Sequence, residues 1–188
     1  MRILRAAQHK RMPWKNGGGE TTEIAVFPEH AGLDDFDWRV SMARVDGDGP
    51  FSSFPGIDRT LAILEGAGIV LDVAGQTPRK LTLDTEPHAF PADAPTSATL
   101  IGGRVIDFNV MSRRGTVAHR VERLVDARIS PAGNERLVLC SSGSVGIIAD
   151  GQTDALGHLD VAILSRSDAA SLLPAPASEY YVVEFTSV

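Results

Sequence analysis

The residues best suited to ligand chemistry gather in two stretches whose glycines and prolines bend the backbone. Residues 12–24 carry a lysine and an asparagine beside three consecutive glycines, and residues 48–59 carry two phenylalanines ahead of a single arginine. Loops of this kind, held by a rigid scaffold, are where binding residues tend to lie. The two stretches therefore predict a ligand pocket, without specifying a reaction.

The first stretch supplies the candidate ligand-binding residues Lys15, Asn16, Glu20 and Thr22. Its glycines would let backbone N–H groups approach a ligand, and Lys15 would add positive charge. The alternative is a Gly-rich turn between two edge strands with a solvated lysine. The triple glycine lacks the Gly-Lys-Ser/Thr ending of a phosphate-binding loop, so it does not indicate a nucleotide site.

The second stretch supplies Phe51, Phe54 and Arg59. The two aromatic side chains are predicted to form a hydrophobic lid, and Arg59 to hold a carboxylate in a bidentate fork. Alternatively, Arg59 pairs with Asp58 or Glu65 at the surface, where an ion pair contributes little stability.

Two expected strands, residues 38–45 and 104–111, add further candidates. Because alternate residues of a strand share a face, each strand places polar side chains together. The side chains grouped in this way are Arg39, Ser41, Asp107, Asn109 and Met111. They are expected either to line a cavity, or to point to solvent, or to form buried ion pairs such as Arg39 with Asp107.

No catalytic or metal-ligating residue is assigned, and no cofactor is expected. The chain has five histidines, and no two of them form a His-x-His pair of the kind that can hold a metal ion. Cys140 lies in an apolar run, where its thiol is expected to be inert. No Gly-x-Ser-x-Gly nucleophile elbow is present.

Composition limits the class of protein further. The chain has 188 residues, a net charge of −6 and a sequence pI of about 5.3, which argue against nucleic acid as a partner. No apolar segment approaches the roughly 20 residues that cross a bilayer, so no membrane partner is expected. With one cysteine and no signal-peptide pattern, the expected location is cytoplasmic, as a monomer or homodimer.

The elements that must position these residues are strands. Alternating segments separated by frequent Gly and Pro turns predict an all-β chain, a sandwich or barrel. A short helical turn is expected only near residues 30–36. The expected strands are residues 20–27, 38–45, 59–65, 68–73, 79–83, 88–90, 98–101, 104–111, 116–121, 135–141, 144–149, 160–164 and 180–186.

The chain also repeats itself. A shift of 76 residues places Gly75-Gln76-Thr77 on Gly151-Gln152-Thr153, and Leu61-Ala62-Ile63-Leu64 on Leu137-Val138-Leu139-Cys140. The same order of strands and turns follows in both halves, which predicts two similar sheets or barrels. We therefore expect two domains, residues 1–112 with the pocket and residues 113–188.

The hairpin of residues 61–68 and 70–73 resembles the glycine-centred hairpin of the cupin jelly-roll barrel. Together with the repeat, it suggests a bicupin, with two cupin-like barrels in one chain. The chain as a whole resembles the HutD/Ves family. The resemblance lies in residues 12–19 with Thr22-Glu23-Ile24, Trp38-Arg39-Val40-Ser41, residues 48–56 with Arg59, and Asp107-Phe108-Asn109-Val110-Met111.

This resemblance implies a bicupin without the usual metal motif, in a bacterial cytoplasmic protein. Some members of the family are linked to histidine-utilisation (hut) genes, and others look stress-related. In the hut context the family looks like a regulator or small-ligand binder, with formylglutamate or a related acid as the suggested ligand.

The favoured hypothesis is a metal-independent bicupin that binds a small anionic metabolite in its N-terminal barrel. The alternative is a metal-independent enzyme, an isomerase or hydrolase of a small carboxylate, with Asp107 or Glu20 as general base. A metal-dependent oxygenase and an interaction-only protein with an exposed apolar patch are the remaining hypotheses.

Overall fold

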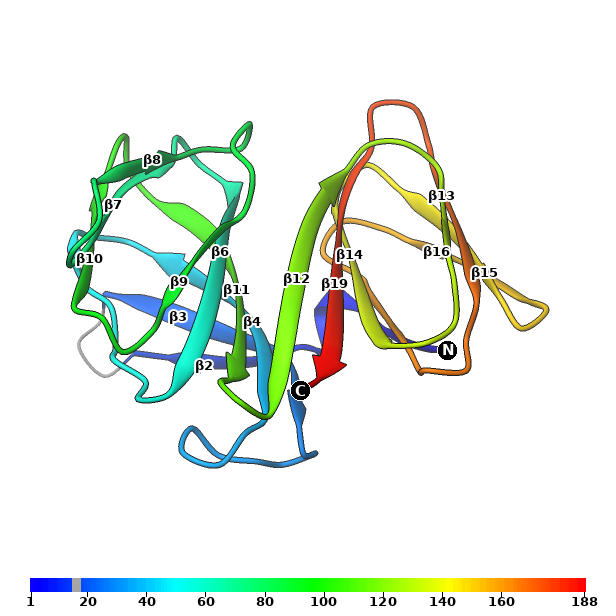
Figure 1. Cartoon of the computed structure of the whole chain (residues 1–188). Helices are drawn as coiled ribbons and strands as arrows, with labels where there is room; N and C mark the ends of the chain where they lie inside the picture. The colour runs from blue at the N-terminus through cyan, green and yellow to red at the C-terminus, as the bar shows by residue number, and fades with distance from the viewer. Residues whose placement is uncertain (15–17) are drawn as a thin grey trace. The chain divides into compact units, whose positions relative to one another are not determined.

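A computed structural model describes residues 1–14 and 18–188 of the chain, and strands dominate it (Figure 1). The prediction of an all-β chain is confirmed. Within the described ranges the helical structure is a single 3-10 turn, η1 (Ala6–Gln8). The segment expected to turn helically, residues 30–36, instead forms turns and irregular backbone.

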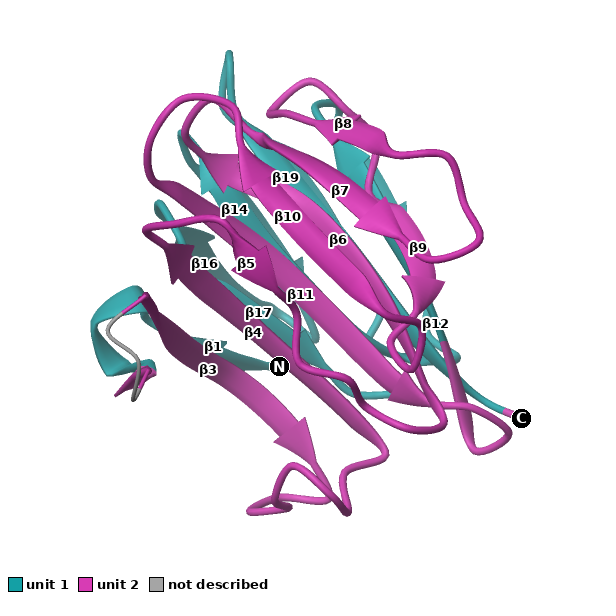
Figure 2. Cartoon of the chain, turned by 90° about the vertical axis from the view of Figure 1, so that its left-hand side faces the viewer, with its two compact units in different colours: residues 1–9, 119–187 teal, residues 10–118, 188 magenta. Residues whose placement is uncertain are grey.

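Contacts divide the chain into two compact units, coloured separately in Figure 2. Unit 1 contains residues 1–9 and 119–187, and unit 2 contains residues 10–118 and 188. These bounds differ from the expected domains 1–112 and 113–188. The first residues belong to unit 1 because Ile3 pairs with Ala162 in an antiparallel ladder.

Unit 2 is built from two sheets. One has six strands in the order β2-β3-β4-β11-β6-β9, and the other has four in the order β5-β10-β7-β8. The strands are β2 (Lys10–Pro13), β3 (Gly19–Phe27), β4 (Trp38–Val45), β5 (Gly49–Pro50), β6 (Ile57–Glu65), β7 (Ile69–Val73), β8 (Arg79–Leu81), β9 (His88–Pro91), β10 (Thr96–Leu100) and β11 (Val105–Arg113).

Unit 1 also has two sheets. Its five-stranded sheet has the order β1-β17-β14-β19-β12, and its four-stranded sheet the order β13-β18-β15-β16. The strands are β1 (Arg2–Leu4), β12 (Val117–Leu124), β13 (Arg128–Ser130), β14 (Glu135–Ser142), β15 (Val145–Ala149), β16 (Gln152–Leu156), β17 (Val161–Leu164), β18 (Ala170–Pro174) and β19 (Glu179–Ser187).

The strand orders of the two units correspond. The order β4-β11-β6-β9 in unit 2 matches β12-β19-β14-β17 in unit 1, and β5-β10-β7-β8 matches β13-β18-β15-β16. The repeat seen in the sequence is therefore also a repeat of topology.

The hairpin glycines refine how the two copies align. Gly66 and Gly143 both follow the long strand with positive φ, so the offset here is 77 residues, whereas Gly75 and Gly151 are 76 apart. Leu61 thus corresponds to Val138 rather than to Leu137. A slip of one residue matters because it moves every side chain to the opposite face of the sheet.

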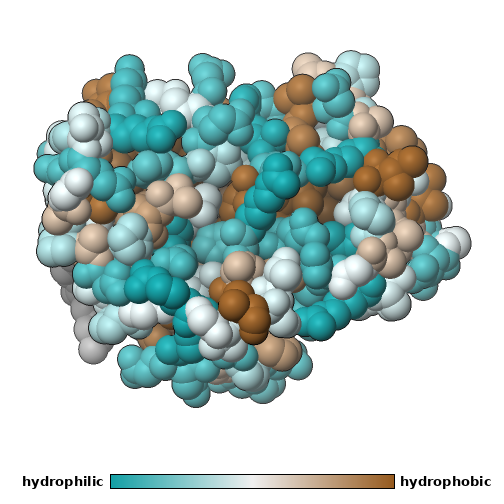
Figure 3. Space-filling view, viewed as in Figure 1, coloured by the Kyte–Doolittle hydropathy of each residue, from teal (hydrophilic) through white to brown (hydrophobic). Residues whose placement is uncertain are grey.

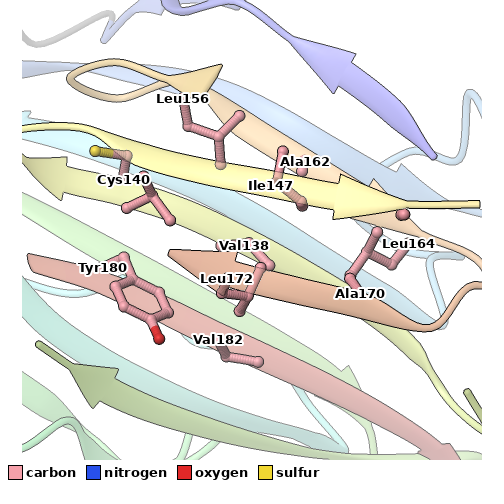
Figure 4. Close-up of a cluster of buried hydrophobic side chains, with 12 residues drawn as sticks. Val138, Cys140, Ile147, Leu156, Ala162, Leu164, Ala170, Leu172, Tyr180 and Val182 are labelled. Carbon is pink, nitrogen blue, oxygen red and sulfur yellow. The ribbon is translucent and has the colours of Figure 1, made fainter. Parts of the chain in front are cut away.

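Each unit has its own apolar core. In unit 2 the core joins residues of both sheets, including Leu61, Ile63, Leu71 and Ala98. Figure 4 shows the core of unit 1, where Tyr180 packs among aliphatic side chains. The Tyr180 hydroxyl donates a 2.6 Å hydrogen bond to the carbonyl oxygen of Asp126, so the buried phenol is satisfied.

Hydrophilic residues cover most of the face in Figure 3, and hydrophobic ones gather on its right-hand side, where β13 and β15 lie in Figure 1. Ile129 of β13 and Leu173 of β18 are the exposed apolar side chains of that sheet with the largest exposed fractions, 78% and 49%. Within residues 1–14 and 18–188, no helix is long and apolar enough to cross a membrane.

Gly68 lies in the hairpin between β6 and β7, at a position that accommodates no larger residue. Gly68 has φ of +103°, and a Cβ here would collide with the carbonyl oxygen of Leu81. Gly68→Ala should therefore lower the free energy of unfolding by more than the roughly 1–2 kcal/mol that left-handed backbone alone costs an alanine.

Gly75→Ala is the matched control, because Gly75 also has positive φ (+83°) but open space around it. Urea unfolding of both variants measures the difference. Equal losses in the two variants would contradict the steric role of Leu81.

Candidate functional site

A group of polar side chains lies on the core-facing side of the six-stranded sheet of unit 2, hereafter the inner face. Strand β11 runs through the middle of this sheet, between β4 and β6. Residues paired across antiparallel strands share a face, so the pairing defines rows across the sheet. The first row is Val26, Arg39, Met111, Arg59 and Phe90; the second is Glu23, Ser41, Asn109, Leu61 and His88; the third is Thr21, Ala43, Asp107 and Ile63.

The first of two buried arginines is Arg39, whose residue is 5% exposed. Its Nε donates a 2.9 Å hydrogen bond to Oε2 of Glu23 on the neighbouring strand. A β-bulge between Glu23 and Ala25 shifts the pairing of β3 with β4 and brings Val26 opposite Arg39. The ion pair that the sequence suggested, Arg39 with Asp107, is therefore replaced by Arg39 with Glu23.

The second is Arg59, two strands away and 8% exposed. Its Nε donates a 2.8 Å hydrogen bond to Oδ1 of Asn109, and its Nη2 donates to the same oxygen. The guanidinium carbon lies 4.4 Å from the centre of the Phe51 ring and 5.9 Å from that of Phe90, at cation–π distance. The surface pairing of Arg59 with Asp58 does not occur, because Arg114 takes that carboxylate at 2.7 Å.

Asp107 is the buried carboxyl group of the cluster, 1% exposed. Nδ2 of Asn109 donates a hydrogen bond to its Oδ1, so the amide bridges Arg59 and Asp107. Burial raises the pKa of Asp107 to about 6, against the opposing effects of the Arg59 charge and the hydrogen bonds from Asn109 and Ala43. Burial also lowers the pKa of Arg59 to about 10, although the Asp107 charge opposes this shift.

The cluster leaves donors unused. Among the described residues, Nη1 and Nη2 of Arg39 and Nη1 of Arg59 find no hydrogen-bond acceptor, and the hydroxyl of Ser41 makes no hydrogen bond. Polar groups in protein interiors are usually satisfied by protein, water or a bound ion. These N–H groups are therefore available to acceptors of a ligand or of water.

Phe51 separates the cluster from a surface hollow of about 480 Å³, which is also lined by Pro50, Asp72 and Thr96. The loop is tied down by a 2.9 Å hydrogen bond from the backbone N–H of Phe51 to the carbonyl oxygen of Thr96. Phe51 thus contacts both the hollow and the Arg59 guanidinium, as a lid residue would.

The structure brings seven of the predicted ligand-binding residues together: Arg39, Ser41, Phe51, Arg59, Asp107, Asn109 and Met111. Glu20 and Thr22 are not among them, because they pair with Arg44 and Met42 and so lie on the opposite face of the sheet. Phe54 packs edge-on against Phe36 in a separate apolar cluster. Lys15 and Asn16 lie outside the described residues.

Sequence reasoning missed Glu23 and Phe90. Glu23 lies on the inner face because it pairs with Ser41. Alternation alone could not choose between the two faces of this strand. The signal that would have found Glu23 is its pairing register with β4, since paired residues share a face.

Unit 1 has a buried arginine at the corresponding place. Arg136 precedes its hairpin glycine by seven residues, as Arg59 does, and is 3% exposed. Its guanidinium donates to Oγ of Ser130 at 2.9 Å, to the carbonyl oxygens of Asn134 and Ser165 at 3.0 and 3.1 Å, and to those of Pro131 and Asp168. All three nitrogens of Arg136 are therefore used within the fold.

A metal site needs a group of His, Cys, Asp or Glu side chains. In residues 1–14 and 18–188, no three His, Cys, Asp or Glu side chains come together in such a group. The polar cluster of the inner face is instead made of guanidinium, amide, hydroxyl and carboxyl groups.

Comparison with known proteins gives a consistent result. The family model for HutD matches residues 6–182. An uncharacterised 21.2 kDa protein in the hutC 3′ region of Pseudomonas putida is 43% identical over 111 residues, which cover 59% of this chain and 57% of that protein. Protein Ves from Citrobacter koseri is 36% identical over 129 residues, 66% of this chain and 65% of Ves. The matched stretches thus span less than two thirds of these relatives.

Solved structures extend the likeness to the whole chain. HutD from Pseudomonas fluorescens has a TM-score of 0.86 and 31% identity, covering all of this chain and 98% of its own. A mutant of oxalate decarboxylase from Bacillus subtilis has a TM-score of 0.66 at 8% identity, covering 97% of this chain and 76% of its own, a likeness of fold alone. The chain therefore has a cupin-like all-β fold.

The burial of Asp107 predicts a pH dependence of stability. Since the native state raises its pKa from 3.8 to about 6, the native state binds this proton more tightly than the unfolded chain. Ionising Asp107 therefore costs stability as pH rises from about 4 to about 6, by about 3 kcal/mol for a shift of about two pKa units. Asp107→Asn, which carries no charge, should be more stable than wild type above pH 6 and similar to it near pH 4.

Urea unfolding at pH 4, 5, 6 and 7.5 measures this difference. Asp72→Asn is the matched control, because Asp72 is exposed on β7 and its substitution should have a small effect at every pH. A deficit of Asp107→Asn relative to wild type that grows from pH 4 to pH 7.5 would contradict the prediction.

Proposed function

Because the chain belongs to the HutD family, we propose that it is a small-molecule-binding bicupin whose unit 2 binds a small organic anion between Arg39 and Arg59. The observation that carries the proposal is that two largely buried arginines on the inner face have, among the described residues, three guanidinium nitrogens without a hydrogen-bond acceptor. The guanidinium groups supply the positive charge, so binding requires no metal ion in this proposal.

Carboxylates fit such donors best. A planar guanidinium offers parallel N–H groups that match the two oxygens of a carboxylate, and the bond strengthens away from water. Arg39 and Arg59 flank Met111, two strand spacings apart, which is about 10 Å between their Cα atoms. Long side chains starting at that separation suit a short dicarboxylate that spans Met111.

The remaining polar groups suit a neutral hydrogen-bonding part of the ligand. The hydroxyl of Ser41 and the second N–H of the Asn109 amide lie in the row beside the two arginines. Formylglutamate, with two carboxylates and a formamide, has this combination of groups. Its binding would agree with a role as a regulator of histidine utilisation in the bacterial cytoplasm, as a monomer or homodimer.

The relatives support this context. One lies in the hutC region of Pseudomonas putida, and the HutD structure from Pseudomonas fluorescens was obtained in a formate condition. Formate is the smallest carboxylate and is therefore a minimal probe for a guanidinium site. A stress-related role is the other context that the family resemblance implies.

An enzyme is the second candidate, favoured by one observation. A buried carboxyl group with a pKa of about 6 is poised for general acid–base catalysis near neutral pH, and Asp107 is such a group. Glu20, the other base suggested by the sequence, lies on the opposite face of the sheet. Turnover of formylglutamate that is lost in Asp107→Asn while the ligand still binds would establish this function.

Calorimetric titration with formylglutamate, urocanate, glutamate and formate tests the binding proposal. Arg59→Ala and Arg39→Ala should each weaken binding of the preferred acid about 10- to 100-fold, since each removes charge-assisted hydrogen bonds worth roughly 1.5–3 kcal/mol. Arg59→Lys, which keeps the charge without the fork, should fall in between.

Arg44→Ala is the matched control. Arg44 lies on the same strand as Arg39 but is exposed and pairs with Asp46 at 3.2 Å, so its loss should leave binding unchanged. Far-UV circular dichroism of each variant checks the fold. Absence of heat with all four acids, or equal affinity in folded Arg59→Ala and wild type, would reject the proposal.

A further inference from the structure

The charges of the buried cluster, Arg39, Glu23, Arg59 and Asp107, balance only while Asp107 is ionised. Arg39 has its counter-charge in Glu23, at 2.9 Å. Arg59 instead hydrogen-bonds the neutral amide of Asn109, and its nearest counter-charge in the cluster is Asp107 on the far side of that amide. A carboxylate arriving at Arg59 therefore gives the buried cluster one negative charge too many.

We propose that the site binds its carboxylate together with one proton, and that Asp107 is the group that takes up this proton. The inference rests on the proposed function and concerns the regulation of the same site. Asp107 acts as a positioning residue through Asn109 and Arg59, without contact with the ligand. No bond of the ligand changes: the anion and one proton leave the solvent, and the Asp107 carboxylate becomes a carboxylic acid.

The physical reason is the low polarity of the surroundings. An uncompensated charge away from water is costly, and a buried carboxyl group neutralises instead. Protonation of Asp107 removes the excess negative charge beside Arg59 once a carboxylate of the ligand occupies that arginine. The protonated acid keeps an acceptor oxygen for Nδ2 of Asn109, so the amide continues to orient Arg59.

The charged groups around Asp107 are few. Arg59 comes from β6, Arg39 from β4, Glu23 from β3 and His88 from β9, and the exposed Lys10 of β2 pairs with Glu23 at the edge of the sheet. The inward residues of the facing sheet are Ile69, Leu71, Val73, Leu81, Thr96 and Ala98, which do not titrate. Glu23 and His88 are therefore the rival proton acceptors. Burial and the nearby Arg79 charge lower the pKa of His88.

Calorimetry with formylglutamate between pH 6 and pH 8 tests the inference, because both carboxyl groups of this probe are already ionised there. Titrations in phosphate and in Tris, which differ in heat of ionisation, report the protons taken up. Wild type should take up close to one proton per ligand at pH 7, and its affinity should fall about 30- to 50-fold from pH 6 to pH 8.

Asp107→Asn should bind without proton uptake and with the same affinity at both pH values. His88→Gln is the matched control and should behave as wild type. Carboxyl ¹³C NMR titration of the wild-type protein provides a measurement free of any substitution: formylglutamate should raise the pKa of one buried aspartate by about two units or more.

The outcomes separate the two proposals. Absence of formylglutamate binding by wild type at every pH counts against the proposed function, and the proton proposal falls with it. Binding with no buffer dependence and equal affinity at pH 6 and pH 8 overturns proton uptake alone and leaves the carboxylate site intact. Proton uptake that persists in Asp107→Asn also overturns the inference: it assigns the proton to His88 if it disappears in His88→Gln, and to Glu23 if it does not.

Discussion

Two guanidinium groups are buried on one face of one sheet, and the site depends on how each is held. A charge removed from water must be paired or hydrogen-bonded, because the free-energy cost of its desolvation otherwise exceeds the stabilisation gained from packing. Arg39 meets this condition with Glu23, and Arg59 with the amide of Asn109 and the ring of Phe51. Each arginine is anchored by part of its donors, so the remainder are available to a ligand or to water.

The sheet itself fixes this geometry. Strand β11 pairs with β4 on one side and β6 on the other, and its inner residues separate the arginines by the width of one strand. Glu23 pairs with Ser41 immediately before the bulge in β3, and its carboxylate accepts the hydrogen bond from Arg39 on the neighbouring strand. The backbone pairing, rather than a flexible loop, therefore determines where the charges stand, which suits a preformed site.

Much of this arrangement followed from the sequence. Alternation within single strands correctly grouped Arg39 with Ser41, and Asp107 with Asn109. It failed where a face had to be chosen relative to another strand, as with Glu20 and Thr22 against Glu23, because register depends on pairing between distant segments. The short strands β1, β2, β5, β13, β16 and β18 were missed for a similar reason, since their local pattern is weak and pairing supports them.

Both units carry a buried arginine at the same place in the fold, Arg59 in unit 2 and Arg136 in unit 1, but the surroundings of the two residues differ. Around Arg136, carbonyl oxygens of neighbouring turns accept from every guanidinium nitrogen, which makes it a clamp for those turns. The residues of β19 that correspond to Asp107 and Asn109 are Tyr180 and Val182, which pack into the core of unit 1. A buried arginine thus becomes available to a ligand only where the surrounding backbone leaves its donors open. The strand order alone does not determine whether the donors of the arginine are open. The backbone acceptors and side chains that surround the arginine determine it.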